Sequence, residues 1–419
     1  GAWCSFRTAP GSLNLVASWV PQLGSQFRVG LDGMGVMLCL LTAIASLLVF
    51  LTIYSRDYEK PNSFYGLMLL SQAGLMGVFT AFDALQFYIF WELALIPVYF
   101  LCSLWGGEKR IAVTFKFFVY TFLGSLLMMV GIIYLYFQTP DHSFSWTSFS
   151  SLQLSPENQK WLFWLFFAAF AIKMPEFPFH TWQPDTYEQA TPAVTMVLSG
   201  VMVKMGLYGV LRGLAPVLSI GTYILGDTVS ALCITGMIYA SLVAIRQDDL
   251  KRLVAYSSIA HVGLMCVAIF ATTDIGMQGV IIQLFNHGVN IIGLWIVVYL
   301  IEKQFHTRKI SELGGLAQKA PVLTTMLVIL AFANIALPLT NSFIGEFLMF
   351  SGIYSSKVTQ YNVVFVVAAA TTIFLAAVYM LNMVQRVFYG PANALTEKAL
   401  DIRWNEKFIL GLIVVLVVI

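Results

Sequence analysis

Charged residues are scarce in this sequence. Only 11% of its 419 residues are Asp, Glu, Lys or Arg, whereas 59% are hydrophobic and the mean hydropathy is +0.80. A soluble globular domain has about a quarter of its residues charged, and a disordered chain has few apolar residues. Both classes are therefore excluded, and most of this chain must face lipid or other apolar helices.

Cysteine is also rare, and its positions show no paired spacing. This pattern indicates no disulfide framework, metal site or iron–sulfur cluster. The chain also contains neither a G-x-G-x-x-G motif nor a P-loop. We therefore expect no cofactor and no metal in this chain. The basic residues flank apolar runs, so we expect contact with a lipid bilayer and no nucleic acid. The five cysteines are Cys4, Cys39, Cys102, Cys233 and Cys266.

Long apolar runs predict an all-α polytopic membrane protein, because a run of about 18 or more residues can span a bilayer as a helix. We expect residues 1–30 to form a loop and the last helix to stop within the membrane, as in a segment of a longer protein. About twelve spans are predicted, at residues 31–53, 63–82, 84–105, 111–137, 160–182, 191–214, 223–245, 253–271, 276–301, 320–351, 361–388 and 407–419.

The loops between these runs differ in basic content. Of the 23 Lys and Arg residues, 15 lie in alternate loops and 5 in the others, while Lys116, Lys173 and Lys204 lie within spans. The positive-inside rule places the richer set in the cytoplasm. The 1–30 loop then faces the other side of the membrane, and residues 389–419 form a cytoplasmic loop and the last helix.

Two of the predicted spans contain proline near their middle. Pro175 and Pro178 interrupt the span at 160–182, and Pro338 interrupts the span at 320–351. Proline lacks an N–H, so we expect a broken helix at each place. The breaks are five spans apart, an odd number, which predicts two five-helix inverted repeats at about 63–214 and 223–388.

Two lysines and a glutamate lie deep inside these runs. Lys204 is about 20 Å into its helix and Glu92 about 12 Å into its own, whereas Lys173 adjoins the first break. A charge at the bilayer centre costs at least about 2.5–3.5 kcal/mol, so such residues are functional candidates. We expect Lys173 to pair with Glu92 and Lys204 to relay protons; the alternative is static ion pairs that fix helix packing.

Other titratable residues extend this axis. His261 and His287 lie within spans, where neutral imidazole can pass a proton, although such histidines can also be plain core residues. Glu346 follows the second break and is a candidate for the last charged station. Glu176, one turn from Lys173, is a candidate local partner, and Lys116 either takes part or reaches the cytoplasmic surface.

Five motifs around these residues resemble those of the antiporter-like subunits of respiratory complex I, from about residue 19 to the end of the chain. The glutamate at Glu346 is similar to that of the M-type subunits, since related types usually have lysine there. The motifs are Phe-Trp91-Glu92; Ala-Ile-Lys173-Met-Pro-Glu-Phe-Pro-Phe-His180; Gly-Val-Met-Val-Lys204-Met-Gly; Asp249-Leu-Lys-Arg-Leu-Val-Ala-Tyr-Ser-Ser-Ile-Ala-His261; and Gly345-Glu346-Phe.

This resemblance implies a proton-translocating subunit of a multi-pass bacterial cytoplasmic-membrane complex that oxidises NADH and reduces quinone. It implies that Glu92 and Lys173 form a controlling pair, that Lys204, His261 and His287 relay protons, and that Glu346 ends the relay. NADH, FMN, iron–sulfur clusters and quinone would be used by other subunits. L-type and N-type antiporter-like subunits would be neighbours.

The sequence departs from the family pattern at three places. Glu176 stands where the family usually has an apolar residue, and Tyr187 where it usually has histidine. Ala336 to Leu339 replace the glycines that commonly flank the second break. Two other functions stay open: a subunit of an Mrp-type cation/proton antiporter or membrane-bound hydrogenase, and a structural membrane scaffold with static ion pairs.

Overall fold

Short polar side chains define the starts of several long helices. The computed structural model of the protein describes residues 14–418. Asp32 caps α1 (Gly33–Ile53), Asp83 caps α3 (Ala84–Trp105), and Asp249 caps α12 (Leu250–Phe270), each through its carboxylate and backbone N–H groups of the first turn. These bonds satisfy N–H groups that the helix itself leaves free.

Nine helical stretches in residues 14–418 are long and apolar enough to cross a membrane, and they coincide with nine of the predicted spans. The other three predicted spans are the two broken helices and the shorter last helix, so the all-α polytopic fold is confirmed. Besides α1, α3 and α12, the nine are α2 (Pro61–Thr80), α4 (Arg110–Gln138), the stretch Pro192–Val217, α11 (Ser219–Ile245), α13 (Asp274–Phe305) and α17 (Asn362–Val387).

The stretch Pro192–Val217 is an irregular helix. Two π-helical turns interrupt it, and Lys204 lies between them. Such turns shift the side chains that follow them around the helix axis, and they often occur at functional sites. The segments are α8 (Pro192–Val197), η4 (Leu198–Met202), α9 (Val203–Gly209), η5 (Val210–Leu214) and α10 (Ala215–Val217).

Both predicted breaks are present. The first follows α6 (Pro156–Lys173), and the chain resumes through η3 (Phe179–Thr181) into α7 (Trp182–Gln189). The second separates α15 (Pro321–Asn334) from α16 (Asn341–Tyr354). Each helix ends where proline prevents it from continuing.

Glycines let other helices approach the first break. A Cβ on Gly206 of α9 would lie 2.8 Å from Met174 Cβ, and one on Gly236 of α11 would lie 2.6 Å from Phe177 Cβ. Any larger residue would push these helices away from the break. The non-helical backbone is therefore enclosed by protein, as it must be at membrane depth.

The expectation of a plain loop at residues 1–30 is wrong for its second part. Asn14–Val20 (β1) and Ser25–Gly30 (β2) pair as an antiparallel hairpin, joined through η2 (Pro21–Leu23) and Gly24 at φ 65°. Strands this short beside a long apolar run gave no periodic signal. Residues 1–13, with Cys4, lie outside the described residues.

The remaining elements are short. Ile419, the last residue of the predicted final helix, is outside the described residues, and α18 otherwise follows the expected position. These elements are α5 (Trp146–Ser150), η6 (Ile310–Glu312), α14 (Leu316–Lys319), η7 (Thr396–Lys398) and α18 (Trp404–Val418).

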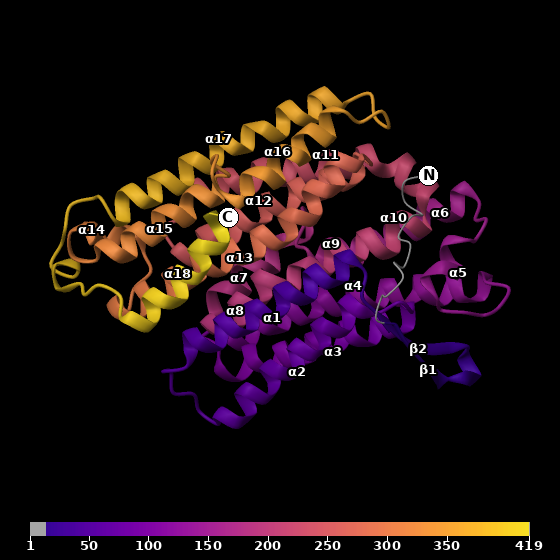
Figure 1. Ribbon diagram of the computed structural model, residues 1–419, viewed down its shortest axis with the longest axis horizontal. Coiled ribbons are helices and arrows are strands. Elements are labelled where there is room, and N and C mark those ends of the chain that lie inside the picture. The colour runs from indigo at the N-terminus through magenta and orange to yellow at the C-terminus, as the bar shows by residue number, and fades with distance from the viewer. Residues whose placement is uncertain (1–13, 419) are drawn as a thin grey trace.

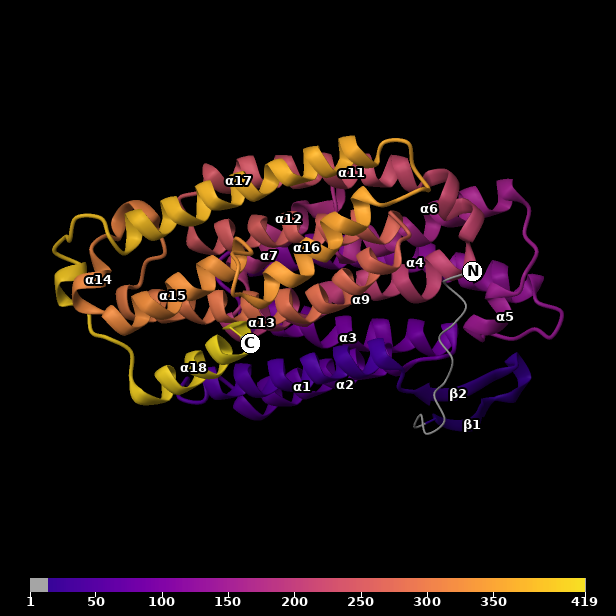
Figure 2. The ribbon, with the colours of Figure 1, turned by 45° about the horizontal axis from the view of Figure 1, so that its top comes forward.

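The long helices run side by side, with α1 to α4 on one side of the bundle and α14 to α17 on the other, while α18 lies between α15 and α1 (Figures 1 and 2). The stretch Pro192–Val217, α12 and α13 lie between them and are almost entirely buried, whereas most of α17 is exposed. These three helices carry Lys204, His261 and His287. The candidate relay thus occupies the centre of the fold.

The second break holds a strained backbone. Ala336 and Leu339 have φ values of 55° and 76°, in the left-handed region that favours glycine. For other residues this conformation costs about 1–2 kcal/mol. Leu339 is 89% exposed, so its side chain contributes little to packing within this chain.

We therefore expect Leu339→Gly to raise the midpoint temperature of thermal unfolding, measured on the purified protein in detergent, because glycine adopts positive φ without this cost. Leu337→Gly, in the same break but without a positive φ, should lower it. A lower midpoint for Leu339→Gly would mean that this turn is not strained.

Candidate functional site

The centre of the molecule contains a buried lysine bonded to a histidine. Lys204 Nζ donates to the carbonyl oxygen of Ser199 at 2.8 Å and lies 2.9 Å from Nδ1 of His287. Lys204 is fully buried. The lysine comes from the first half of the chain and the histidine from α13 in the second. Their contact joins α9 to α13.

A line of polar side chains continues from His287 through the second nitrogen of its ring. Nε2 of His287 lies 3.3 Å from the hydroxyl of Ser258 on α12, one turn from His261. The rings of His261 and His287 are 5.7 Å apart between centroids. His261 Nδ1 then lies 3.1 Å from Oε1 of Glu346 on α16. Four predicted residues, Lys204, His287, His261 and Glu346, are thus brought together in this order.

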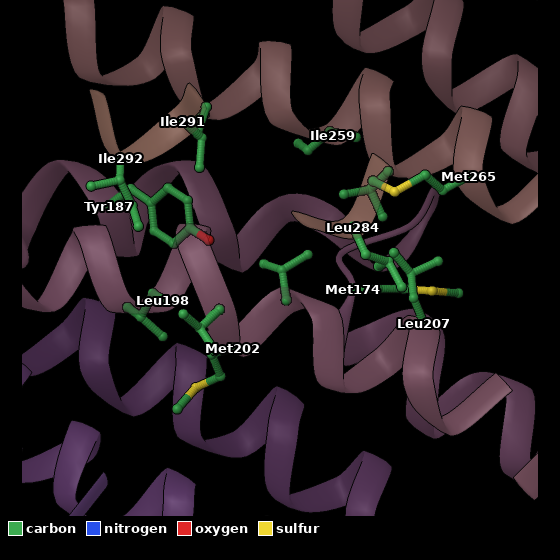
Figure 3. Close-up of a cluster of buried hydrophobic side chains, with 14 of the residues drawn as sticks. Met174, Tyr187, Leu198, Met202, Leu207, Ile259, Met265, Leu284, Ile291 and Ile292 are labelled. Carbon is green, nitrogen blue, oxygen red and sulfur yellow. The ribbon is translucent and has the colours of Figure 1, made fainter. Parts of the chain in front are cut away.

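Apolar side chains enclose this line. Leu207 follows Lys204 by one turn and Leu284 precedes His287 by one turn; both are buried, with Met174 beside them (Figure 3). Interactions between charged or polar groups are strengthened where water is excluded. The only described carboxylate in direct contact with the line is Glu346, at its end.

Lys204 has no carboxylate oxygen within 4.0 Å among the described residues. An ammonium group at this depth without a counter-ion is costly, whereas the neutral amine is not. Its neighbour His287 is a neutral acceptor or donor and does not hold the positive charge in place. The arrangement therefore allows Lys204 to lose and regain a proton.

The expected contact between Lys173 and Glu92 is absent. Lys173 is 2% exposed, and its Nζ has no hydrogen-bond partner; it lies 5.5 Å from the ring centre of Trp91. Oε1 of Glu92 also lacks a partner. Trp91 and Glu92 are successive residues on α3, about 100° apart around its axis, and the indole face is the one turned to the lysine. The lysine amine faces the indole ring of Trp91 instead of the expected carboxylate.

The expected local pair between Glu176 and Lys173 is absent as well. Glu176 is 1% exposed, and neither of its carboxylate oxygens has a hydrogen-bond partner. The helix ends at Lys173, so the i, i+3 spacing no longer places the two side chains on one face.

Lys116 lies at the surface. Its Nζ donates to Asp185 Oδ2 at 2.8 Å and to the carbonyl oxygen of Thr181 at 3.0 Å. Asp185 also accepts from Arg252, which bonds Glu188; Glu188 in turn bonds Arg308. These ion pairs tie α4, α7, α12 and the segment after α13 together at the predicted cytoplasmic end.

The pKa of Asp185 reflects this network. Burial favours the neutral acid, but hydrogen bonds and charges from Lys116 and Arg252 outweigh burial and lower the pKa below its usual value. The pKa of Arg308 is raised in the same manner, because Asp249, Glu302 and Glu188 outweigh its burial. The charged groups at this end therefore have partners of opposite charge, whereas Lys204 at the centre has none among the described residues.

Sequence reasoning missed the hydroxyl groups beside the lysine. Thr191, Thr195 and Ser199 recur every four residues along one face leading to Lys204, and all three are buried. Buried oxygens of Thr191 and Ser199 have no partner. The i, i+4, i+8 spacing was visible in the sequence, but hydroxyl residues in apolar helices often bond their own backbone and gave no distinct signal.

A cavity of about 580 Å³ opens at the predicted cytoplasmic end of this hydroxyl face. Its lining includes Thr191, Lys251 and Glu302, and Lys251 Nζ lies 2.9 Å from Glu302 Oε2. Polar, roomy cavities of this kind hold water. Deeper inside, the hydroxyl of Tyr187 and the amide of Gln183 are buried without partners.

No group of three or more His, Cys, Asp or Glu side chains that could hold a metal lies within residues 14–418. The four described cysteines, Cys39, Cys102, Cys233 and Cys266, are free thiols. The lysine, histidine and glutamate side chains of the line can each bind a proton.

Comparisons with known proteins identify the family of this chain. A family model described as "NADH:quinone oxidoreductase/Mrp antiporter, TM" matches residues 81–375. NADH-quinone oxidoreductase subunit M of Rickettsia typhi is 39% identical over 378 residues, covering 89% of this chain and 74% of that protein. NAD(P)H-quinone oxidoreductase chain 4 of Acaryochloris marina is 36% identical over 402 residues, covering 95% and 75%.

Solved structures share the fold. A chain of respiratory complex I from Thermus thermophilus with bound NADH aligns with a TM-score of 0.90 and 29% identity, over 99% of this chain and 86% of that one. A chain of the Mrp complex from Dietzia aligns with a TM-score of 0.85 over 99% of this chain and 45% of that one. At 22% identity the second match concerns the fold alone.

The charge network makes stability depend on pH. Above its unfolded-state value near 3.8, Asp185 is ionised and contributes stability, which is lost as pH falls through the lower folded-state pKa. We expect Asp185→Asn to lower the thermal unfolding midpoint at pH 7, by the equivalent of about 1 kcal/mol or less because the pair is partly exposed.

The difference between Asp185→Asn and the natural protein should shrink as pH is lowered towards the acid range, in unfolding scans at a series of pH values. Glu108→Gln, at an exposed loop carboxyl, is the matched control and should unfold at the same midpoint as the natural protein. A difference in midpoint between Asp185→Asn and the natural protein that stays constant with pH would rule out the ionic contribution to stability.

Proposed function

The chain belongs to the family of membrane subunits shared by NADH:quinone oxidoreductases and Mrp antiporters, and we propose that it is the M-type proton-translocating subunit of an NADH–quinone oxidoreductase. The observation that carries this proposal is the buried line from Lys204 through His287 and His261 to Glu346. Each member can bind or release a proton, and the line crosses from the first half of the chain to the second.

Protons move along this line by short transfers. The Lys204 ammonium gives a proton to Nδ1 of His287, and the imidazole releases the proton on Nε2 towards Ser258 and His261. His261 passes it to Glu346, whose carboxylate lies within hydrogen-bond distance. The neutral amine left at Lys204 is then ready to accept the next proton.

Proton supply to Lys204 comes from the cytoplasmic end. The cavity there reaches Thr191, and Thr195 and Ser199 continue the hydroxyl face to the lysine. Water bound along unpartnered hydroxyl groups would connect the cavity with Lys204.

Energy for this transport enters from partner chains. The redox groups implied by the family, namely NADH, FMN, iron–sulfur clusters and quinone, belong to other subunits in this proposal. Glu92 and Lys173 control the relay through the electric field between them, because their side chains do not touch. A movement of either charged group changes the free energy of the protonated form of Lys204.

Neighbouring L-type and N-type subunits would cover the exposed apolar side of the bundle. Along α17, the exposed residues include Val364, Val367 and Phe374. Such a surface fits a lipid or a further apolar helix. We place the complex in a bacterial cytoplasmic membrane, which is consistent with relatives from Rickettsia.

Two other functions make different predictions. In an Mrp-type antiporter the same relay would be driven by an ion gradient, without NADH. In a structural scaffold, neutralising Lys204 would lower assembly of the complex but leave turnover per assembled complex unchanged. The two curated relatives described above, at 39% and 36% identity, are named as quinone oxidoreductase subunits, which favours the first proposal.

Lys204→Met tests the proposal, because methionine keeps the volume and removes the titrating group. In sealed vesicles containing the assembled complex, we expect NADH-driven proton uptake to fall about a hundredfold, the effect of removing a group that transfers protons. NADH oxidation either slows with it or continues uncoupled.

Lys160→Met is the matched control, since Lys160 is an exposed lysine on α6. Lys160→Met should leave the rates of NADH oxidation and of proton uptake unchanged. Normal proton uptake at normal turnover in Lys204→Met would reject the relay. A natural complex that pumps protons without oxidising NADH would favour the antiporter.

A further inference from the structure

The break after α6 contains an isolated acid. Glu176 is 1% exposed, and both of its carboxylate oxygens are buried without a hydrogen-bond partner. No other Asp or Glu among residues 14–418 has both oxygens in this state. A buried polar group without a partner requires a physical explanation.

The groups around Glu176 carry no positive charge in contact with it. On α11, the thiol of Cys233 faces the carboxyl, and Cys266 of α12 lies beside that thiol. On its own segment, His180 stacks on Phe177, while the Lys173 amine is turned to Trp91 of α3. Met174 and Phe177 bring α9 and α11 against the break. A thiol is a weak donor and does not stabilise a carboxylate strongly.

An ionised carboxylate in this position would be costly by several kcal/mol, whereas a neutral carboxylic acid is not. The same argument applies to Lys173, whose amine is buried without a partner. Two separated buried groups of opposite type are cheapest when both are neutral. They are cheapest as an ion pair only when they touch.

The backbone between the two groups is not held in a helix. α6 ends at Lys173, and the N–H of Glu176 donates to Ala171 over a wider turn. Glu176 is three residues from Lys173, within reach of its long side chain if that side chain leaves Trp91. Contact between the two groups would require the lysine side chain to leave Trp91 and the non-helical backbone between them to reorient.

We infer that Glu176 is a second proton-carrying residue of the translocation machinery and exchanges a proton with Lys173 across the helix break. When the side chains of Lys173 and Glu176 touch, the lysine is an ammonium and the glutamate is a carboxylate. On separation, one N–H bond breaks and one O–H bond forms, leaving a neutral amine and a neutral acid with no change in net charge. The structure shows the separated arrangement.

This inference rests on the proposed function and gives Lys173 an acidic partner that is independent of Glu92. Glu92 lies on α3, on the side to which the lysine now points. Lys173 therefore lies between two acids, and its position determines which of them shares its proton.

The test uses Glu176→Gln in the assembled complex in sealed vesicles. Glutamine keeps the shape but cannot carry the proton, so NADH-driven proton uptake per assembled complex should fall by about tenfold or more. Glu157→Gln, at an exposed acid on the same α6, is the matched control and should be unaffected. Glu176→Asp should retain part of the uptake.

Infrared spectroscopy supplies a readout that a packing role would not change. The natural complex should show a carboxylic-acid C=O band that disappears in Glu176→Gln and shifts in Glu176→Asp. Absence of that band, or normal uptake at normal turnover in Glu176→Gln, would overturn the inference. If Glu176→Gln fails to assemble, the band in the natural complex and its shift in Glu176→Asp decide.

The Lys204→Met variant separates this inference from the proposed function. Loss of uptake in Lys204→Met with normal uptake in Glu176→Gln would leave the relay intact and reject the role of Glu176. Normal uptake in both variants would reject both proposals.

Discussion

The cost of an unpaired charge inside an apolar protein governs the rest of this structure. Lys204 is fully buried and contacts a carbonyl oxygen and an imidazole, but no carboxylate within 4.0 Å. A carboxylate partner would hold the ammonium permanently, because separating a buried ion pair is expensive. A neutral histidine satisfies the hydrogen bond and still lets the proton leave. The residues that complete the line are arranged around this condition.

Charged groups at the predicted cytoplasmic end are arranged in the opposite way. Asp185, Glu188, Arg252 and Arg308 form direct ion pairs between helices from both halves. Each group has a partner of opposite sign within salt-bridge distance. The same residue types therefore fasten helices at this end and, in the proposed relay, carry protons at the centre, and the difference lies in whether their partners are charged.

The fold supplies the buried, largely apolar surroundings of this line. The most deeply buried helical stretches, Pro192–Val217, α12 and α13, carry Lys204, His261 and His287, and buried Leu207 and Leu284 lie one turn from Lys204 and His287 (Figure 3). Proline breaks interrupt α6 and separate α15 from α16, and glycines let neighbouring helices close over the first break. Lys204 and Glu346 come from opposite halves, so the line crosses the boundary between them. Transport along it requires both halves to be in place.

The sequence alone determined the spans, the two breaks and which charged residues are central, because hydropathy and the missing N–H of proline act locally. Only the tertiary structure decided their partners: His287 for Lys204, Trp91 in place of Glu92 for Lys173, and none for Glu176. Successive residues differ by about 100° around a helix, and π-helical turns shift that angle further. Spacing along the chain therefore cannot show which side chains meet between helices, and that meeting depends on how all the helices pack.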